Sequence, residues 1–77
     1  MDSHTLSMAT VVQKFGTKLR KLRKSKGFTQ VKLAEKAKID FSYLNLIEGG
    51  KRNPTLKVIA KIARALGARL EELLKLK

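Results

Sequence analysis

The sequence contains no cysteine and no tryptophan, and it has a single histidine among its 77 residues. Without cysteine the chain can form neither disulfides nor thiolate zinc sites, and it has no thiol nucleophile. The one histidine, His4, lies near a polar start where a tail is expected, and it has no partner there for metal binding or proton transfer. Groups that could act as acid, base or nucleophile occur only singly. We therefore expect no enzyme activity, no metal and no cofactor.

Long apolar runs are also absent. No stretch approaches the roughly 20 residues that a membrane span requires. The start, with Asp2 and no apolar segment, does not resemble a secretory signal. We expect a cytoplasmic protein that is not a membrane protein. A chain of this length holds one small domain, so no small-molecule ligand is expected, and stability must come from tight helix packing or from a second subunit.

Negative charge is scarce, whereas positive charge is abundant. Eighteen Lys and Arg residues against six Asp and Glu residues give a formal net charge of +12. Such a field attracts polyanions, which leaves nucleic acid and anionic membranes as the realistic partners. Seven of the basic residues fall within residues 14–26. A run of this kind also fits a solvated helix face, so charge alone does not decide between these readings.

Apolar residues recur at three- and four-residue intervals along most of the chain, which predicts helices. The first helix is predicted to start at Ala9 and to end before Gly27, a residue suited to the left-handed conformation that closes helices. Its stripe consists of Val12, Phe15, Leu19 and Leu22. Residues 1–8 lack this periodicity and are predicted to form a disordered tail ahead of a single domain over 9–77.

Two short helices, joined by a tight turn, are predicted next. Thr29 is a good N-cap for the first, over residues 30–37. Asp40 is the predicted N-cap of the second helix, and Gly49 and Gly50 are predicted to end it.

Two further helices complete the prediction. Pro54 disfavours helix at Asn53, and Thr55 can cap a fourth helix that Gly67 ends. The stripe of this helix consists of Leu56, Ile59, Ile62, Ala63 and Leu66. In the last segment, 68–77, we expect Leu70 and Leu73 to lie inside the core. No strand pattern and no repeat occurs, so the sequence predicts an all-α fold of five helices.

A series of short motifs runs in order, without gaps, over about residues 15–74. It comprises Phe15-Gly16, Arg23, Gly27-Phe28-Thr29-Gln30, Leu33-Ala34, Ile39, Ser42-Tyr43-Leu44, Ile47-Glu48, Gly50-Lys51-Arg52-Asn53-Pro54, Ile62-Ala63 and Ala65-Leu66-Gly67. Together these motifs resemble the phage-repressor/Cro-like helix-turn-helix family. The short chain is similar to stand-alone members such as restriction-modification controller proteins. The resemblance implies a compact repressor-like domain, with the helix-turn-helix at about residues 29–49, that regulates transcription by binding double-stranded DNA.

In this family the helix that starts near Gln30 lies across the DNA backbone, and the helix that starts near Asp40 enters the major groove. That groove is about 12 Å wide and admits one helix, whose early residues face the base edges. The residues predicted to contact bases are Phe41, Ser42, Asn45 and Leu46. Asn45 can pair in bidentate fashion with adenine, and Ser42 can donate or accept a hydrogen bond.

Two of these residues depart from the family pattern, because related sequences often carry Arg, Gln or Lys where this chain has Phe41 and Leu46. Strong guanine readout is therefore not expected. Phe41 could pack on a thymine methyl group. Alternatively, both side chains pack against the protein itself or against a second subunit.

Phosphate contacts are expected on both sides of the recognition helix. Gln30 resembles the family residue that anchors a phosphate at the start of the first motif helix, where helix amides add to the anion site. Tyr43, Lys51, Arg52 and Asn53 are the other predicted phosphate contacts, which would set register and affinity without choosing a sequence. A solvated surface is the alternative.

Arg23 and Glu48 are predicted to form a structural ion pair. The family typically pairs these two positions, which ties the first helix to the end of the recognition helix.

A homodimer is expected because one eight-residue helix reads too few base pairs to find a site in a genome. Two copies on a twofold axis would read the half-sites of a palindrome, about 34–36 Å apart. The terminal leucines exceed what a short last helix needs for its own packing. Leu74 and Leu76 are predicted to lie at the dimer interface.

Other functions remain open. An antitoxin of a toxin–antitoxin pair resembles this fold, but it needs a segment that grips the toxin, which only residues 1–14 or 68–77 could supply. A cationic membrane-binding peptide would need wide apolar faces opposite lysines, a condition that the first helix alone meets. RNA binding fits the charge, but few aromatic residues are available for base stacking.

Overall fold

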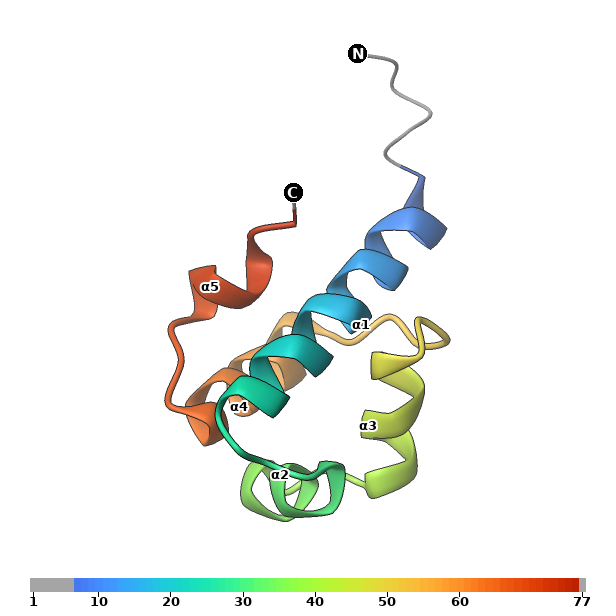
Figure 1. Ribbon diagram of the computed structural model, residues 1–77. Helices are drawn as coiled ribbons and strands as arrows, with labels where there is room; N and C mark the ends of the chain where they lie inside the picture. Colours follow the sequence, from blue (N-terminus) through green and yellow to red (C-terminus); the bar gives the residue numbers. More distant parts are fainter. Residues whose placement is uncertain (1–6, 77) are drawn as a thin grey trace.

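The computed structural model describes residues 7–76 and contains five α-helices in that range, with no strand among them (Figure 1). The helices are α1 (Met8–Ser25), α2 (Gln30–Ala37), α3 (Phe41–Glu48), α4 (Leu56–Leu66) and α5 (Leu70–Leu74). The predicted all-α fold is confirmed. Helix α1 begins one residue before the predicted start. Ser7 and Met8 of the predicted tail are the N-cap and the first residue of α1. Residues 1–6, with His4, lie outside the described residues.

Side-chain caps determine where three of the helices begin. Ser7, Thr29 and Thr55 have extended backbone, and each accepts a hydrogen bond from the amide three residues further on. Asp40 has the N-cap position of α3, as predicted, but its carboxylate caps no α3 amide. It accepts a hydrogen bond from Ser42 Oγ instead, at 2.9 Å.

Left-handed residues terminate helices and redirect the chain. Gly27 and Gly67 take positive φ after α1 and α4, as their positions in the sequence predicted. Lys38, between α2 and α3, also takes a positive φ of 57°, which L-residues with a Cβ adopt at some cost. The amide of Ile39 donates to the carbonyl oxygen of Ala34 at 3.0 Å and closes this turn. The turn sets the direction in which α3 leaves α2.

A single core joins all five helices. Its fully buried large side chains are Leu19, Leu33, Leu44, Ile47, Ile62 and Leu73. Burial of one such side chain stabilises the fold by about 1.5–3 kcal/mol. Because every helix contributes at least one of these side chains, α3 is held on a rigid support.

Helices α1 and α3 meet at Gly16. A Cβ atom at this position would lie 2.5 Å from the carbonyl oxygen of Ile47 and 2.6 Å from that of Glu48. The missing side chain therefore lets the end of α3 touch the backbone of α1. In Figure 1, α3 and α5 lie on opposite sides of α1, and α2 packs against both α3 and α4.

Two leucines that were expected to face the core are exposed. Leu56 is the first residue of α4 and is 67% exposed, since this helix becomes buried only one turn later, at Ile59. Leu70 is 38% exposed, so the expectation that it lies inside was wrong. Helix α5 is only five residues long and buries one residue, Leu73, which leaves Leu70 and Leu74 facing outward.

None of the helices within residues 7–76 has the length and apolar character that crossing a membrane requires.

Candidate nucleic-acid interface

One face of helix α3 is buried in the core, and the opposite face is exposed. Leu44, Ile47 and Glu48 are its buried residues. Phe41, Ser42 and Asn45 are exposed and fall within about 100° of one another around the helix, because successive residues are about 100° apart. Leu46 is only partly exposed. Three of the four predicted base-contact residues thus share an accessible face.

The exposed face of α3 offers different chemistry at each position. Phe41 is 46% exposed, so much of its ring is free for an outside contact. Ser42 uses its hydroxyl proton on Asp40, which leaves its oxygen free to accept. Asn45 has two donor protons and one acceptor oxygen.

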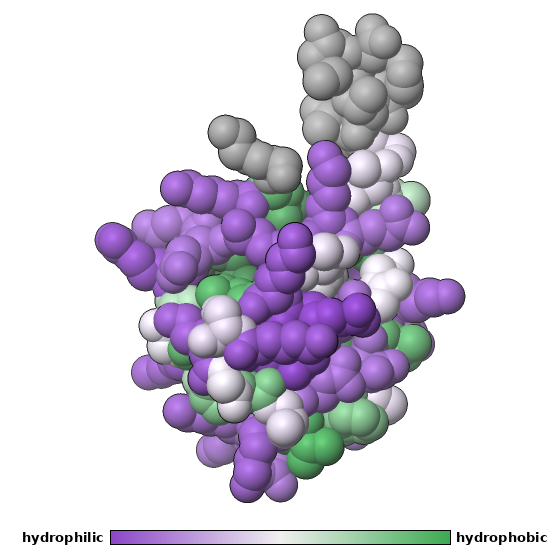
Figure 2. Space-filling model, viewed as in Figure 1, coloured by the Kyte–Doolittle hydropathy of each residue, from purple (hydrophilic) through white to green (hydrophobic). Residues whose placement is uncertain are grey.

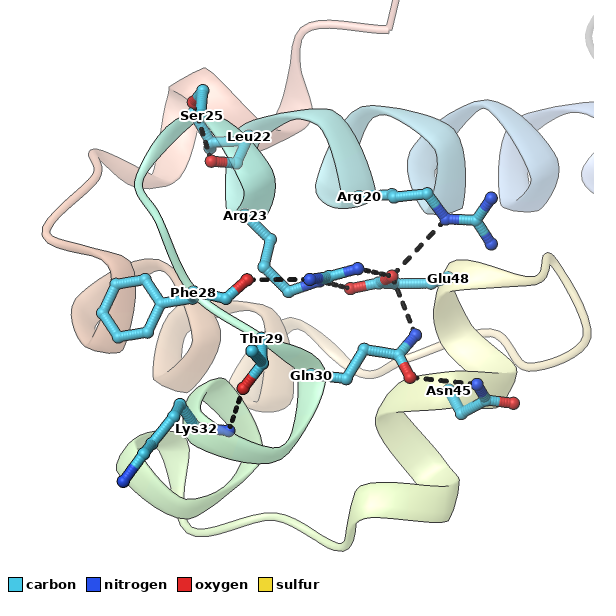
Figure 3. Close-up of polar contacts among 10 residues, drawn as sticks. All are labelled: Arg20, Leu22, Arg23, Ser25, Phe28, Thr29, Gln30, Lys32, Asn45 and Glu48. Atoms are coloured by element: carbon cyan, nitrogen blue, oxygen red, sulfur yellow. Dashed lines mark hydrogen bonds and ion pairs between the residues drawn. The ribbon is translucent and has the colours of Figure 1, made fainter.

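Beneath this face, Arg23 and Glu48 form a buried pair that joins α1 to α3 (Figure 3). Arg23 Nε donates to Glu48 Oε2 at 2.6 Å, and Nη2 donates to Oε1 at 3.0 Å. A third nitrogen of the guanidinium, Nη1, donates to the carbonyl oxygen of Phe28 at 2.8 Å. Glu48 is only 3% exposed. The sequence predicted this pair as structural, and the structure brings the two residues together as a two-bond fork.

The pair extends toward the surface through two amides. Gln30 Nε2 donates to Glu48 Oε1 at 3.0 Å, and Asn45 Nδ2 donates to Gln30 Oε1 at 3.1 Å. Figure 3 shows this chain running from α1 through the end of α3 to the start of α2 and back to α3. Within residues 7–76, no buried side-chain nitrogen or oxygen lacks a hydrogen-bond partner. Gln30, which was predicted to contact phosphate, and Asn45, which was predicted to contact bases, are thus hydrogen-bonded to each other.

Arg20 is a member of this network that the sequence analysis missed. Its Nε atom lies 3.6 Å from Glu48 Oε1, and its side chain is 51% exposed. Arg20 precedes Arg23 by three residues, which places both on one face of α1. That spacing was the signal available in the sequence.

The predicted phosphate contacts differ in accessibility. Lys51, Arg52 and Asn53 are exposed in the segment that follows α3. The segment is fixed at its start, because the Lys51 amide donates to the carbonyl oxygen of Leu46 at 2.9 Å. Tyr43 is partly buried against the core. Hydrophilic side chains cover most of the described face in Figure 2, with small apolar areas between them.

The two predicted dimer residues lie in different environments. Leu74 is 41% exposed, whereas Leu76 is partly buried and packs against the core of its own chain. Leu76 also lines an open hollow of about 470 Å³ beside α1, together with Lys14, Lys18 and Lys75. The two leucines do not form one free apolar surface.

In the described part of the chain, no group of three or more His, Cys, Asp or Glu residues is placed to hold a metal ion.

The residues of this surface lie within the part of the chain that is similar to known proteins. A model of the helix-turn-helix family matches residues 19–73. Control protein C.MunI of a Mycoplasma species is 44% identical over 61 residues, which cover 78% of this chain and 82% of that protein. The immunity repressor protein of Bacillus phage phi105 is 44% identical over 52 residues, or 68% of this chain and 36% of that protein.

Among solved structures, the restriction-modification controller protein C.AhdI from Aeromonas hydrophila is similar to this chain. The two share 44% sequence identity with a TM-score of 0.79, over 80% of this chain and 94% of the other.

Proposed function

Because this chain belongs to the helix-turn-helix family, we propose that it binds a palindromic operator in double-stranded DNA as a homodimer, with α3 of each copy in the major groove. It is a DNA-binding transcription regulator, as its motifs predicted. The observation that carries the proposal is the exposed face of α3, where Phe41, Ser42 and Asn45 project from a helix whose other face is anchored in the core.

For base contacts we propose Asn45 and Ser42 first. Asn45 can hydrogen-bond N6 and N7 of adenine, and the Ser42 oxygen can accept from a base amino group. The exposed ring of Phe41 suits a thymine methyl group. Leu46, which is partly buried, has less surface to offer and is the weakest member of the set.

For phosphate contacts we propose Gln30 and the exposed residues Lys51, Arg52 and Asn53. Gln30 is the first residue of α2, where helix amides without partners inside the helix favour an anion. Tyr43 contributes through its hydroxyl group at most, since the ring packs against the core. The net charge of +12 adds a long-range attraction to DNA.

For the dimer interface we propose Leu74 together with Leu70. Both are exposed, and they are one turn apart on α5. Leu76 contributes less, because its own core covers part of it. We further propose that the regulator acts in the cytoplasm, where its DNA is. No observation on residues 7–76 favours the antitoxin or membrane-peptide alternatives.

Selection of bound duplexes from a random pool tests the proposal. We expect a palindrome whose half-sites are about 10–10.5 base pairs apart, or a multiple of that spacing. Apparent affinity should fall steeply as salt rises, because each phosphate contact releases counterions. A motif without twofold symmetry would contradict the dimeric arrangement, and no enriched motif would contradict sequence-specific binding.

Two variants separate base contact from phosphate contact. Asn45→Ala should relax one position in each half-site, with a loss of about 1–3 kcal/mol of discrimination there. Lys51→Ala is the matched control, which should weaken binding to all sequences about equally and reduce the salt slope by about 1. If Asn45→Ala leaves the selected motif unchanged, the assignment of Asn45 as a base contact is wrong.

A further inference from the structure

A surface asparagine can present either of two faces to a base. Its carboxamide oxygen accepts hydrogen bonds, whereas its nitrogen donates two, and the two orientations have nearly the same shape. In the major groove, adenine offers an N6 donor beside the N7 acceptor, and guanine offers the O6 and N7 acceptors. The base that Asn45 selects therefore depends on which way its amide is turned.

The hydrogen-bond network beneath α3, which begins at Glu48, allows only one of these two orientations of Asn45. An ionised carboxylate only accepts hydrogen bonds. Glu48 is 3% exposed and is held by two bonds from Arg23, so it cannot rotate away. The group that Gln30 turns toward Glu48 must consequently be its nitrogen, and this is the contact observed, at 3.0 Å from Oε1.

The orientation of Gln30 then dictates that of Asn45. With Nε2 on Glu48, the oxygen of Gln30 faces Asn45, and an amide oxygen only accepts. Asn45 must turn its nitrogen toward Gln30, where Nδ2 lies 3.1 Å from Oε1. Figure 3 shows the oxygen of Asn45 pointing away from Gln30. This leaves Asn45 with its oxygen and one N–H for an outside partner.

We infer that Gln30 is a positioning residue for sequence recognition: it transmits the fixed polarity of Glu48 to Asn45, so that Asn45 selects adenine and rejects guanine. The inference rests on the proposed function, in which α3 faces base edges. The free oxygen of Asn45 accepts from adenine N6 while its free N–H donates to N7. At guanine the same oxygen would face O6, and two acceptors repel.

Reversing Asn45 to suit guanine would bring its oxygen against the oxygen of Gln30 and break the bond at 3.1 Å. Gln30 cannot follow, because its own reversal would place an oxygen against Glu48. The orientation of the Asn45 amide is thus set in the protein before DNA binds. Gln30 sets this orientation without contacting the base itself.

The variant Gln30→Met tests this inference. Methionine has similar length and helix propensity but neither amide group. Glu48 keeps both bonds from Arg23, so the fold is retained, which thermal unfolding checks. Released from Gln30, the amide of Asn45 can turn either way. The adenine-over-guanine preference at its position, expected to be about 5- to 150-fold in the unaltered protein, should fall toward 1.

A double-mutant cycle isolates the orientation effect. Gln30→Met also removes the proposed phosphate contact, but that loss lowers binding to all duplexes equally and cancels in the adenine-to-guanine ratio. In an Asn45→Ala background, Gln30→Met should leave the ratio unchanged.

The outcomes distinguish the inference from the proposed function. If Asn45→Ala relaxes the position but Gln30→Met leaves the ratio as it was, the inference is overturned and the proposed function stands. If Asn45→Ala relaxes nothing, both the base contact and the inference built on it are overturned.

If Gln30→Met fails to fold, the inference can still be tested on the unaltered protein. Its side-chain amide protons can be followed by NMR without DNA. We expect one Asn45 amide proton to exchange more slowly than those of Gln13, an exposed glutamine on α1. Equal exchange at the two residues would overturn the inference.

Discussion

Arg23 and Glu48 are the two buried charged residues among residues 7–76. Removing charges from water is costly, and here the cost is offset by a fork of two hydrogen bonds, by the bond that Arg23 donates to the carbonyl oxygen of Phe28 and by the bond that Gln30 donates to Glu48. Each residue of the pair therefore depends on the other. Arg23, a single side chain of α1, thus supports the fold and holds the carboxylate from which the hydrogen bonds to Gln30 and Asn45 extend.

Arg23→Ala should lower the free energy of unfolding by about 3–5 kcal/mol, because it strands the Glu48 carboxylate in the interior. Denaturant or thermal unfolding measures the loss. Arg20→Ala is the matched control: its ion pair is longer and half exposed, and the expected cost is about 0–1 kcal/mol. Equal losses for the two variants would show that the buried pair has no special role.

At the scale of helices, the close approach of α1 and α3 at Gly16 decides how α3 sits on the molecule. The obstacle to any side chain there is backbone, namely the carbonyl oxygens of Ile47 and Glu48, which cannot rotate aside as a side chain could. The end of α3 is consequently positioned by contact with α1 as well as by the turn from α2. This positions the exposed face of α3 relative to the rest of the domain.

Gly16→Ala tests the close approach. Within a free helix, alanine would be favoured over glycine by about 1 kcal/mol. Here the added Cβ should instead destabilise the protein by about 1–3 kcal/mol or more, since α3 must move outward. We also expect weaker DNA binding.

Gly49→Ala is the control for that variant. Gly49 has a φ of −81°, and an added Cβ would lie no closer than 3.5 Å to its neighbours. Alanine there should leave stability unchanged or raise it by up to about 1 kcal/mol. Both variants are compared by thermal unfolding. A stable Gly16→Ala protein would contradict the packing of α1 on α3.

For the whole molecule, positive charge and exposed apolar surface act in opposite directions. The formal charge of +12 repels a second copy, whereas the leucines of α5 favour contact with one. Screening by salt weakens the repulsion, because the Debye length falls from about 30 Å at 0.01 M to about 10 Å at 0.1 M. Apolar contact is not screened. DNA lowers the repulsion further by neutralising the basic surface.

Dimerisation should therefore strengthen as salt rises, and again when operator DNA is added, as sedimentation can measure. Leu74→Asp should abolish the dimer, although it reduces the net charge and hence the repulsion. Val31→Asp, the same charge change at an exposed residue of α2, should leave dimerisation in the absence of DNA intact. A monomer at high protein concentration in moderate salt, with and without DNA, would contradict the dimeric arrangement.

The helices, the charge and the family could be predicted from the amino-acid sequence alone. These follow from signals that act within a turn or so of helix, such as the Thr29 cap, the Gly67 stop and apolar spacing at three and four residues. The net charge follows from composition and requires no knowledge of the fold. The Arg23–Glu48 pairing was also predictable, but through the resemblance of the motifs and not through local physics.

Contacts between side chains on different helices could not be predicted from such local signals, because they depend on how the helices pack. That Gln30 joins Glu48 to Asn45 depends on the angle between α2 and α3, which the turn at Lys38 and the packed core set. Leu70 was misplaced for the same reason, because its burial depends on how far α5 extends over its neighbours. Periodicity defines the faces of a helix, whereas contact between distant residues requires the helices to be placed on one another.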